Sequence, residues 1–434
     1  MLHAQNENIR KLLLEGNFGL EKESLRVDEN GFLAHTDHPF PDDSHVVRDF
    51  CENQTEINTP VAGSPHEVVE VLNASYCKMQ EQLALLEEPE YLWPFSNPSY
   101  IRNENDIPIA NFQGKEVSKT EYREYLSARY GRYKMTFSGI HFNYSFGENL
   151  LQADFALSGE TDFAKYKEKL YLSLAGQAVA YGWLMVAVTA ASPLMDSSFV
   201  EKGQFDGDVF NGMASVRCGE MGYWNFFVPV LDYSSVQTYA DSIQRYVDDG
   251  WLRFPSELYY PVRLKPAGEN TLQNLRKRGV NHIELRMFDL NPLVSCGVDE
   301  RDVAFAQLLL VWLASKPPQP FPGSAQVQAV QNFKNAAHYD LKTVSLQKSN
   351  GQVVTVADAA LDVISEMEEF YQDFSEETKE LLRFEKDKFV EQENRYSWKV
   401  RELYGNGFVK KGLELAKQRQ REALGIGNIT EKRG

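Results

Sequence analysis

The chain has 434 residues, of which 43% are hydrophobic and 12% aromatic, enough to bury a large core in one large domain or two smaller ones. Its formal net charge of −17 argues against nucleic acid or an anionic membrane as a partner, because either would require a basic surface. The N-terminus lacks a signal-peptide pattern, and no CxxC spacing occurs among Cys51, Cys77, Cys218 and Cys296. We therefore expect a protein of the reducing cytoplasm.

The first predicted element is a β-strand over residues 18–27, FGLEKESLRV, in which Glu21 and Glu23 lie two positions apart. Successive strand residues point to opposite faces, so both carboxylates share one face, about 6.5 to 7 Å apart. Two like charges at this spacing repel each other unless a cation lies beside them. Clusters of oxygen ligands hold Mg²⁺, usually together with substrate phosphates. A solvated strand face would show the same alternation, so a metal site and a solvated face are both compatible with this segment.

A second acidic segment, DFCENQTEINTP over residues 49–60, carries Asp49, Glu52 and Glu56. Helical spacing would align all three acids on one face. An unbroken strand would instead align Glu52 with Glu56 and send Asp49 to the opposite face. Both arrangements stay open at this point.

Two later segments, residues 138–146 and 282–288, alternate as strands do. His141 lies on the polar face of the first, where a metal ligand and a satisfied core histidine are alternatives. Glu284 and Arg286 lie on the polar face of the second. This pair suits a metal and a phosphate respectively, and it also suits a structural cross-strand ion pair.

Arginines in aromatic surroundings form a further feature, at Arg123, Arg217 and Arg263. Guanidinium groups bind carboxylate and phosphoryl oxygens in a bidentate manner. The sequence contains neither GxGxxG nor GxxxxGK[ST], the two common phosphate-binding loops. A bound nucleotide would therefore have to be held by metal and arginine.

Three segments predict helices of the core. Residues 66–86 have helical apolar spacing, and residues 303–314 are short and nearly all apolar. Residues 170–195 carry no charged residue and are long enough to cross a bilayer. This segment contains polar residues, lacks a basic flank and ends at Ser192-Pro193, so we predict a buried helix.

The clearest break is the proline-rich run at residues 317–323. Beyond it, residues 357–374 and 376–421 are rich in helix formers and charge, and Thr355 begins a possible capping box. We therefore predict a core over residues 1–316 and a mostly helical C-terminal subdomain, residues 317–434, packed on it. Separate helices with antiparallel-type strands favour an α+β fold over a doubly wound parallel sheet.

Taken together, the segments resemble a known family. They occur in the order seen in glutamate-cysteine ligase, or γ-glutamylcysteine synthetase, of the bacterial type, which includes the ligase half of bifunctional glutathione-forming enzymes. The resemblance spans roughly residues 15–315 and is carried by FGLEKESLRV, DFCENQTEINTP, YLWPFSNPSY, EYREYLSARYG, FSGIHFNYSF, RCGEMGYWN, ELYYPVR and IELRMFDLNP, followed by GVDE.

This resemblance implies a fold similar to the catalytic domain of glutamine synthetase, in which a curved antiparallel sheet forms a funnel with flanking helices. It implies ATP, L-glutamate and L-cysteine as reactants, with γ-glutamyl phosphate as the intermediate, in the first step of glutathione biosynthesis. All reactants but the amine are anionic, so an acidic site requires divalent cations. The resemblance implies two or three Mg²⁺ ions, with Mn²⁺ as a substitute.

The family's site residues map onto this chain by motif. Its metal ligands fall on Glu21, Glu23, Asp49, Glu56, His141 and Glu284, with Glu52 a weaker candidate in the same motif. Its catalytic arginines fall on Arg123, Arg217 and Arg286. Its cysteine pocket falls on Phe50, Tyr122, Leu126, Met135, Tyr223 and Tyr259.

The chain departs from the family pattern at three positions. Met135 stands where better-known bacterial members have glutamine, Asn97 replaces a methionine, and Gly219 replaces a serine. These changes bear on the incoming amine, so a γ-glutamyl ligase for another amine, and a non-catalytic nucleotide-binding relative, remain alternatives. The chain ends at Gly434 without a further nucleotide-binding domain, so it is expected to make the dipeptide and stop. The sequence leaves the oligomeric state open.

Overall fold

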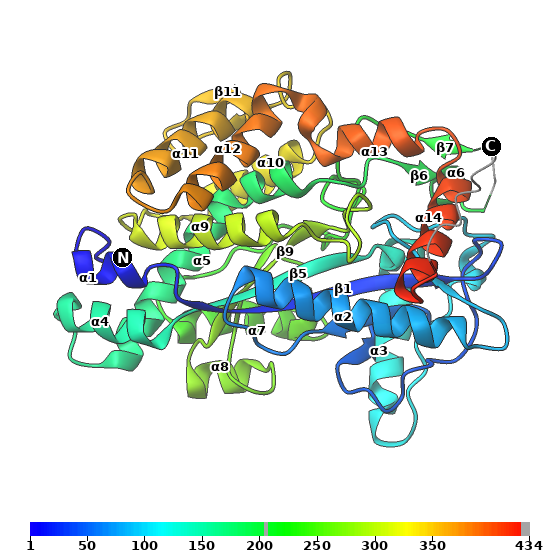
Figure 1. Cartoon of the computed structure of the whole chain (residues 1–434). Helices are drawn as coiled ribbons and strands as arrows, with labels where there is room; N and C mark the ends of the chain where they lie inside the picture. Colours follow the sequence, from blue (N-terminus) through cyan, green and yellow to red (C-terminus); the bar gives the residue numbers. More distant parts are fainter. Residues whose placement is uncertain (204–206, 427–434) are drawn as a thin grey trace.

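An antiparallel sheet with helices on its flanks forms the centre of the computed structural model, which describes residues 1–203 and 207–426 (Figure 1). The strand order is β2-β3-β1-β5-β9-β8, with β4 paired to β1, and every pairing is antiparallel. The strands are β1 (Gly16–Val27), β2 (Val46–Arg48), β3 (Gln54–Asn58), β4 (Tyr91–Leu92), β5 (Gly139–Phe146), β8 (Val262–Lys265) and β9 (His282–Asp289). This architecture confirms the α+β prediction.

The two faces of the sheet differ in chemistry because the side chains alternate along each strand. One face is apolar and includes Leu20, Phe142 and Ile283, all at most 1% exposed. Helices α2 (Pro65–Ala84) and α5 (Phe163–Thr189) contact the sheet, α2 through β1 and β3 and α5 through β8 and β9. The apolar face is thus buried by helices, whereas the other face carries the polar side chains.

Helix α5 is the one described helix with the length and apolar character of a membrane span. However, 83% of its most apolar window is buried inside the protein. The prediction of a buried core helix is therefore confirmed, although the helix ends at Thr189 rather than near Met195. Residues Met195–Asp196 form the short strand β6, which pairs with β7 (Asp208–Val209).

The remaining helices surround this core. The predicted helices at residues 66–86 and 303–314 correspond to α2 and to α9 (Glu300–Ser315). Shorter helices join the strands: α1 (Glu7–Leu12), α3 (Val117–Tyr130), α4 (Glu148–Ser158), α6 (Ser197–Val200), α7 (Val236–Asp248) and α8 (Leu272–Arg278).

Beyond the proline-rich break the chain is mainly helical, with one small hairpin. In Figure 1, α10 to α12 lie over α9 and α5, and α14 returns beside α2. Thr355 accepts a hydrogen bond from Asp358 N, so the predicted helix start is confirmed. The elements are α10 (Gly323–Ala336), β10 (Ser345–Gln347), β11 (Val353–Thr355), α11 (Val356–Phe370), α12 (Glu376–Val390), α13 (Tyr396–Tyr404) and α14 (Phe408–Ala423).

Candidate active site

The register of the sheet brings four acidic side chains and a histidine onto its polar face. Glu21 lies opposite His141 across β1 and β5, and Glu23 lies opposite Glu56 across β1 and β3. On the far side of β5, Asn143 pairs with Glu284 of β9. Because these positions have the same parity along their strands, their side chains project from one face.

A tight turn between β2 and β3 explains where Asp49 lies. Asp49 N donates to Gln54 O, and Gln54 N donates to Cys51 O, both at 3.0 Å. The acidic segment is therefore neither a helix nor one unbroken strand. The turn reverses the chain, so that Asp49 and Glu56 both line the same cavity while Glu52 does not.

This cavity has a volume of about 270 Å³ and opens on the polar face of the sheet. All fifteen site residues predicted from the sequence line it. They are Glu21, Glu23, Asp49, Phe50, Glu56, Tyr122, Arg123, Leu126, Met135, His141, Arg217, Tyr223, Tyr259, Glu284 and Arg286.

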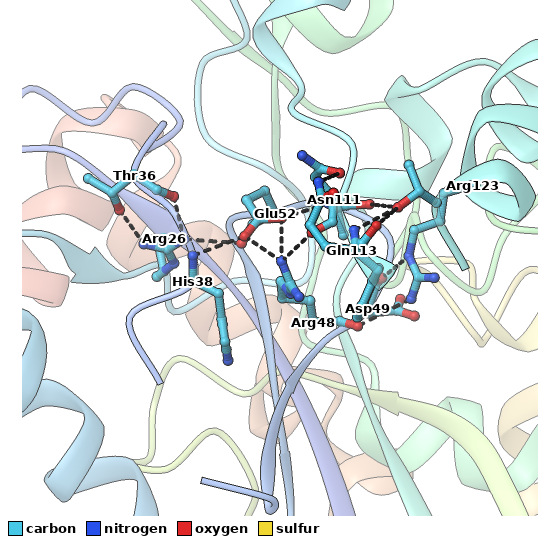
Figure 2. A network of polar contacts seen from close by, with 12 residues as sticks. Arg26, Thr36, His38, Arg48, Asp49, Glu52, Asn111, Gln113 and Arg123 are labelled. Carbon is cyan, nitrogen blue, oxygen red and sulfur yellow. Dashed lines mark hydrogen bonds and ion pairs between the residues drawn. The ribbon is translucent and has the colours of Figure 1, made fainter. Parts of the chain in front are cut away.

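Glu52, the weaker metal candidate, is instead part of a structural network beside the site (Figure 2). Its two carboxylate oxygens each accept from Arg48 Nη1 at 2.8 Å. Backbone N–H groups of His38 and Asn111 donate to the same carboxylate, at 2.9 and 2.8 Å. These contacts fix the turn that presents Asp49, and they leave Glu52 no role as a ligand in the cavity.

The densest group of candidate metal ligands consists of Glu21, His141 and Glu284, whose ligand atoms all lie within 4.8 Å of one another. His141 Nδ1 lies 2.9 Å from Glu21 Oε2 and 3.8 Å from Glu284 Oε1. The other oxygen of Glu284, Oε2, is buried and has no hydrogen-bond partner. A buried carboxylate oxygen without a partner is costly, so this atom fits a cation ligand.

Electrostatics divide the carboxylates into two kinds. Burial, together with the nearby charge of Asp49, raises the pKa of both Glu23 and Glu56. For Glu284, burial opposes ionisation, but Lys265 and Arg286 hold the pKa well below its usual range. The Lys265 ammonium lies 3.0 Å from Glu284 Oε1, and Arg286 Nη1 lies 3.2 Å from it.

The three predicted arginines are each held in place by the protein. Arg123 donates to the backbone carbonyls of Asp49, Arg48 and Lys119. Figure 2 shows its guanidinium beside Asp49. Arg217 donates from Nη1 and Nη2 to two carbonyls of β9, at 3.3 and 3.0 Å. Fixed guanidinium groups at a cavity wall cost little reorganisation when an anion binds.

Gly139 makes the position of Arg217 possible. A Cβ atom at this residue would lie 2.2 Å from Cζ of Arg217. The N–H of Gly139 also donates to Glu23 Oε2 at 2.8 Å. Gly139, at the start of β5, therefore lets the guanidinium of Arg217 lie against the backbone. Its N–H also orients the carboxylate of Glu23.

Another part of the cavity lining is aromatic and apolar. The rings of Tyr223 and Tyr259 have centroids 3.9 Å apart, and Leu126 and Met135 are buried, at 5% and 3% exposure. Neither Asn97 nor Gly219, the other two departures from the family pattern, lines the cavity. Asn97 donates to the carbonyls of Ser192 and Leu194, which is a structural role.

Sequence reasoning missed several lining residues. Arg263 was noted only as one arginine among several, and Lys265 was not singled out, although both share the cavity face of β8. Apolar and cationic residues alternate in VRLK, residues 262–265, and this pattern could have identified both side chains. The other lining residues that the predicted set did not include are Lys134, Phe137, Cys218, Trp224, Ser256, Tyr260, Pro261 and Phe333.

Comparison with known proteins relates most of the chain to one family. The family profile described as glutamate-cysteine ligase matches residues 2–251 and 226–336. The bifunctional glutathione biosynthesis protein GshAB of Listeria monocytogenes (serotype 4b, strain F2365) is 32% identical over 431 residues, which is 95% of this chain and 55% of that protein. The protein of the same name from Clostridium perfringens is 30% identical, with the same coverage of both chains. This chain thus spans about half the length of these curated relatives.

Solved structures show the same fold. A glutamate-cysteine ligase from Francisella tularensis, in complex with AMP, superposes with a TM-score of 0.86 at 23% identity, covering 94% of this chain and 89% of that one. A bifunctional glutathione synthetase from Pasteurella multocida gives 0.83 at 24% identity, covering 98% and 55%. The glutamate-cysteine ligase profile matches well over half of the residues of this chain, so the chain belongs to that family.

Proposed function

We propose that the chain catalyses the ATP-dependent ligation of the γ-carboxylate of L-glutamate to the amine of L-cysteine. The observation that carries the proposal is the composition of one cavity, where Glu21, Glu23, Asp49, Glu56 and Glu284 face a wall of arginine and lysine. Such a site suits anionic reactants bound with divalent cations. Membership of the family and the names of the relatives support this reaction.

Two or three Mg²⁺ ions are proposed as the resident cations, held by the five carboxylates and His141. The donor set fits, since oxygen ligands with one imidazole are compatible with Mg²⁺ or Mn²⁺. The buried, unpartnered oxygen of Glu284 supports the same conclusion. When bound, the ions would neutralise the phosphate charge and polarise the transferring group.

In the first proposed step, an oxygen of the glutamate γ-carboxylate attacks the γ-phosphorus of ATP, and ADP leaves with the electrons of the broken P–O bond. Arg217 and Arg286 line the cavity beside the acidic cluster, so they would stabilise the phosphoryl oxygens. Arg123 would contribute a guanidinium to a substrate carboxylate or to the phosphoryl group. The role of these residues is to position and to stabilise charge.

In the second proposed step, the neutral amine of the acceptor attacks the acyl carbon of γ-glutamyl phosphate. Phosphate leaves with the electrons of the broken C–O bond, and the amine nitrogen releases one proton to phosphate or solvent. The acceptor would bind beside Phe50, Leu126, Met135 and Tyr259, apolar and aromatic lining that suits a small uncharged side chain. Exclusion of water by these side chains would protect the acyl phosphate from hydrolysis.

The helical segment is proposed to support this site from behind. Helix α10 packs on α5, Tyr371 Oη donates to the Leu308 carbonyl at 2.7 Å, and Lys388 pairs with Asp302 at 3.0 Å. The predicted subdomain spans residues 317–434, of which residues 427–434 lie outside the described part of the structure. We propose that its described part, up to residue 426, holds α5 and α9 against the apolar face of the core predicted at residues 1–316.

The test is a direct assay. The protein is incubated with ATP, Mg²⁺, L-glutamate and one of a panel of amino acids, and the product is identified by mass. We expect γ-glutamylcysteine and one phosphate per peptide bond. Phosphate release without a peptide, or a product with no γ-glutamyl group, would contradict the proposal.

A further inference from the structure

One cationic side chain that lines the cavity has no bonding partner among the described residues. Six cationic side chains line it: Arg123, Lys134, Arg217, Arg263, Lys265 and Arg286. Five of them already bond within the protein, either to backbone carbonyls (Arg123, Arg217 and Arg263) or to the carboxylate of Glu284 (Lys265 and Arg286). Within residues 1–203 and 207–426, no hydrogen bond or ion pair engages the side chain of Lys134.

Lys134 belongs to a rigid turn. It lies in the 3₁₀ helix Tyr133–Thr136, in which the other three residues are buried and Lys134 is half-buried. Met135 N donates to Arg132 O at 3.0 Å, and Gln54 Nε2 holds the Phe137 carbonyl at 2.9 Å. The backbone on both sides of Lys134 is thus held in place, and this limits the positions in the cavity that the ammonium group can occupy.

Lys134 is flanked by apolar and aromatic lining residues. Met135 and Phe137 line the cavity beside it, whereas Glu21, Glu23, Glu56 and Glu284 belong to the strands of the sheet. Under the proposed function, the acidic cluster takes the phosphates and the glutamyl group. The apolar and aromatic part of the lining is therefore left for the acceptor amino acid, which carries a carboxylate of its own.

An amino acid acceptor needs a partner for that carboxylate, because burying it alone would be costly. Charge-assisted hydrogen bonds to an ammonium group are about twice as strong as neutral ones. The surrounding rings lower the local dielectric and so strengthen the attraction further. The half-buried ammonium of Lys134, which has no partner among the described residues, can supply this hydrogen bond.

We propose that Lys134 binds the α-carboxylate of the acceptor amino acid and so makes the enzyme selective for amino acids over simple amines. The inference rests on the proposed function, since it concerns the second substrate of the same reaction. It assigns to Lys134 a binding role that is separate from the metal cluster and from the phosphoryl-transfer step.

The experiment compares acceptors with and without the carboxylate in the wild type and in Lys134→Met. The pairs are L-cysteine with cysteamine, and L-2-aminobutyrate with propylamine. We expect Lys134→Met to lower kcat/KM for both amino acids at least about tenfold, through KM, and to leave both simple amines within about twofold. Where the simple amines react too slowly, their inhibition constants against cysteine supply the comparison.

Two further variants complete the design. Lys134→Arg keeps the charge and should recover a substantial part of the lost affinity for the amino acids. Lys115→Met is the control, because it changes the net charge by the same amount as Lys134→Met. It removes an exposed lysine outside the cavity, so it should behave as the wild type. KM for ATP and for glutamate should stay unchanged in all three variants.

The outcomes separate this inference from the proposed function. If Lys134→Met lowers kcat/KM equally for cysteine and cysteamine, or raises KM for ATP or glutamate instead, the proposed role of Lys134 is wrong. The ligase activity proposed above would not be affected by either result. No loss in Lys134→Met would also overturn the role of Lys134. A wild-type protein that forms no γ-glutamyl product with any acceptor would overturn both.

Discussion

Glu23 and Glu56 face each other across the β1–β3 ladder, and burial raises the pKa of both carboxyl groups. Two buried acids in direct register are unfavourable in the protein alone, because like charges opposite each other destabilise a sheet. Their position on the polar face makes sense when a divalent cation provides the opposite charge. The sheet register therefore connects the stability of the fold to the occupancy of the proposed metal site.

The first prediction follows from this pair. Glu56→Gln should raise the melting temperature of the metal-free protein, since it removes one of two opposed acids. The same variant should lose most of the stabilisation that Mg²⁺ or Mn²⁺ gives the wild type, and its turnover should fall by about 100-fold or more. Thermal unfolding with chelator and with added metal measures the first two effects. An unchanged response to metal would exclude Glu56 as a ligand.

The second prediction concerns Glu52→Gln, the matched control for Glu56→Gln, because both acids belong to the same hairpin. Glu52 accepts hydrogen bonds from Arg48 and from two backbone N–H groups outside the cavity. Its loss should lower the free energy of unfolding by about 1 to 3 kcal/mol while the response to metal persists. Denaturant unfolding gives the first quantity. A metal response that disappears in Glu52→Gln would place this acid in the site after all.

The third prediction concerns the contact between Gly139 and Arg217. Gly139→Ala should displace the guanidinium, since the added methyl group would overlap it. We expect a fall in kcat of about 100-fold, similar to Arg217→Lys, as is typical when one oriented donor is lost. The double variant should be little worse than either single one, because both remove the same interaction. Additive losses would show that Gly139 acts by another route.

The fourth prediction concerns acceptor choice at Met135. A pocket lined by Leu126, Met135 and Tyr259 should accept a small uncharged side chain, so 2-aminobutyrate should react beside cysteine. One methylene group is worth only about 1 to 3 kcal/mol in such a pocket. Met135→Gln should widen the preference for cysteine by providing a polar neighbour for the thiol. Competition assays measure the ratio of the two specificity constants, and a ratio that stays the same or falls would exclude Met135 as a determinant.

The fifth prediction concerns Lys22, which points away from the cavity. Burial lowers its pKa to about 7, while its ammonium lies 4.7 Å from the ring centroid of Tyr76. Between pH 7 and the ordinary lysine value the unfolded chain binds more protons, so this group makes stability rise with pH by about 1.4 kcal/mol per unit. The stability of Lys22→Met relative to the wild type should therefore decrease by about 2 kcal/mol between pH 7.5 and 9. A stability difference between Lys22→Met and the wild type that does not change with pH would contradict the lowered pKa of Lys22.

The elements of the fold were largely predictable from the sequence. Strands β1, β5 and β9 and helices α2 and α9 follow from apolar periodicity, a local property of the chain. The long helical stretch after residue 376 was predicted less well, because it divides into α12, α13 and α14. Its interruptions include the left-handed Gly407, where the chain turns α14 back toward α2.

The sequence alone determined which acids and arginines form the candidate site, because their residue types and spacing carry the family's motifs. The tertiary structure decided their arrangement. The turn after β2 brings Asp49 to the side of Glu56 and sends Glu52 into a structural network with Arg48, which neither helical nor strand periodicity could indicate. The strand pairing and the cavity depend on contacts between residues far apart in the chain, as does the position of Lys134, whose ammonium has no partner within residues 1–203 and 207–426. Local propensity does not encode such contacts.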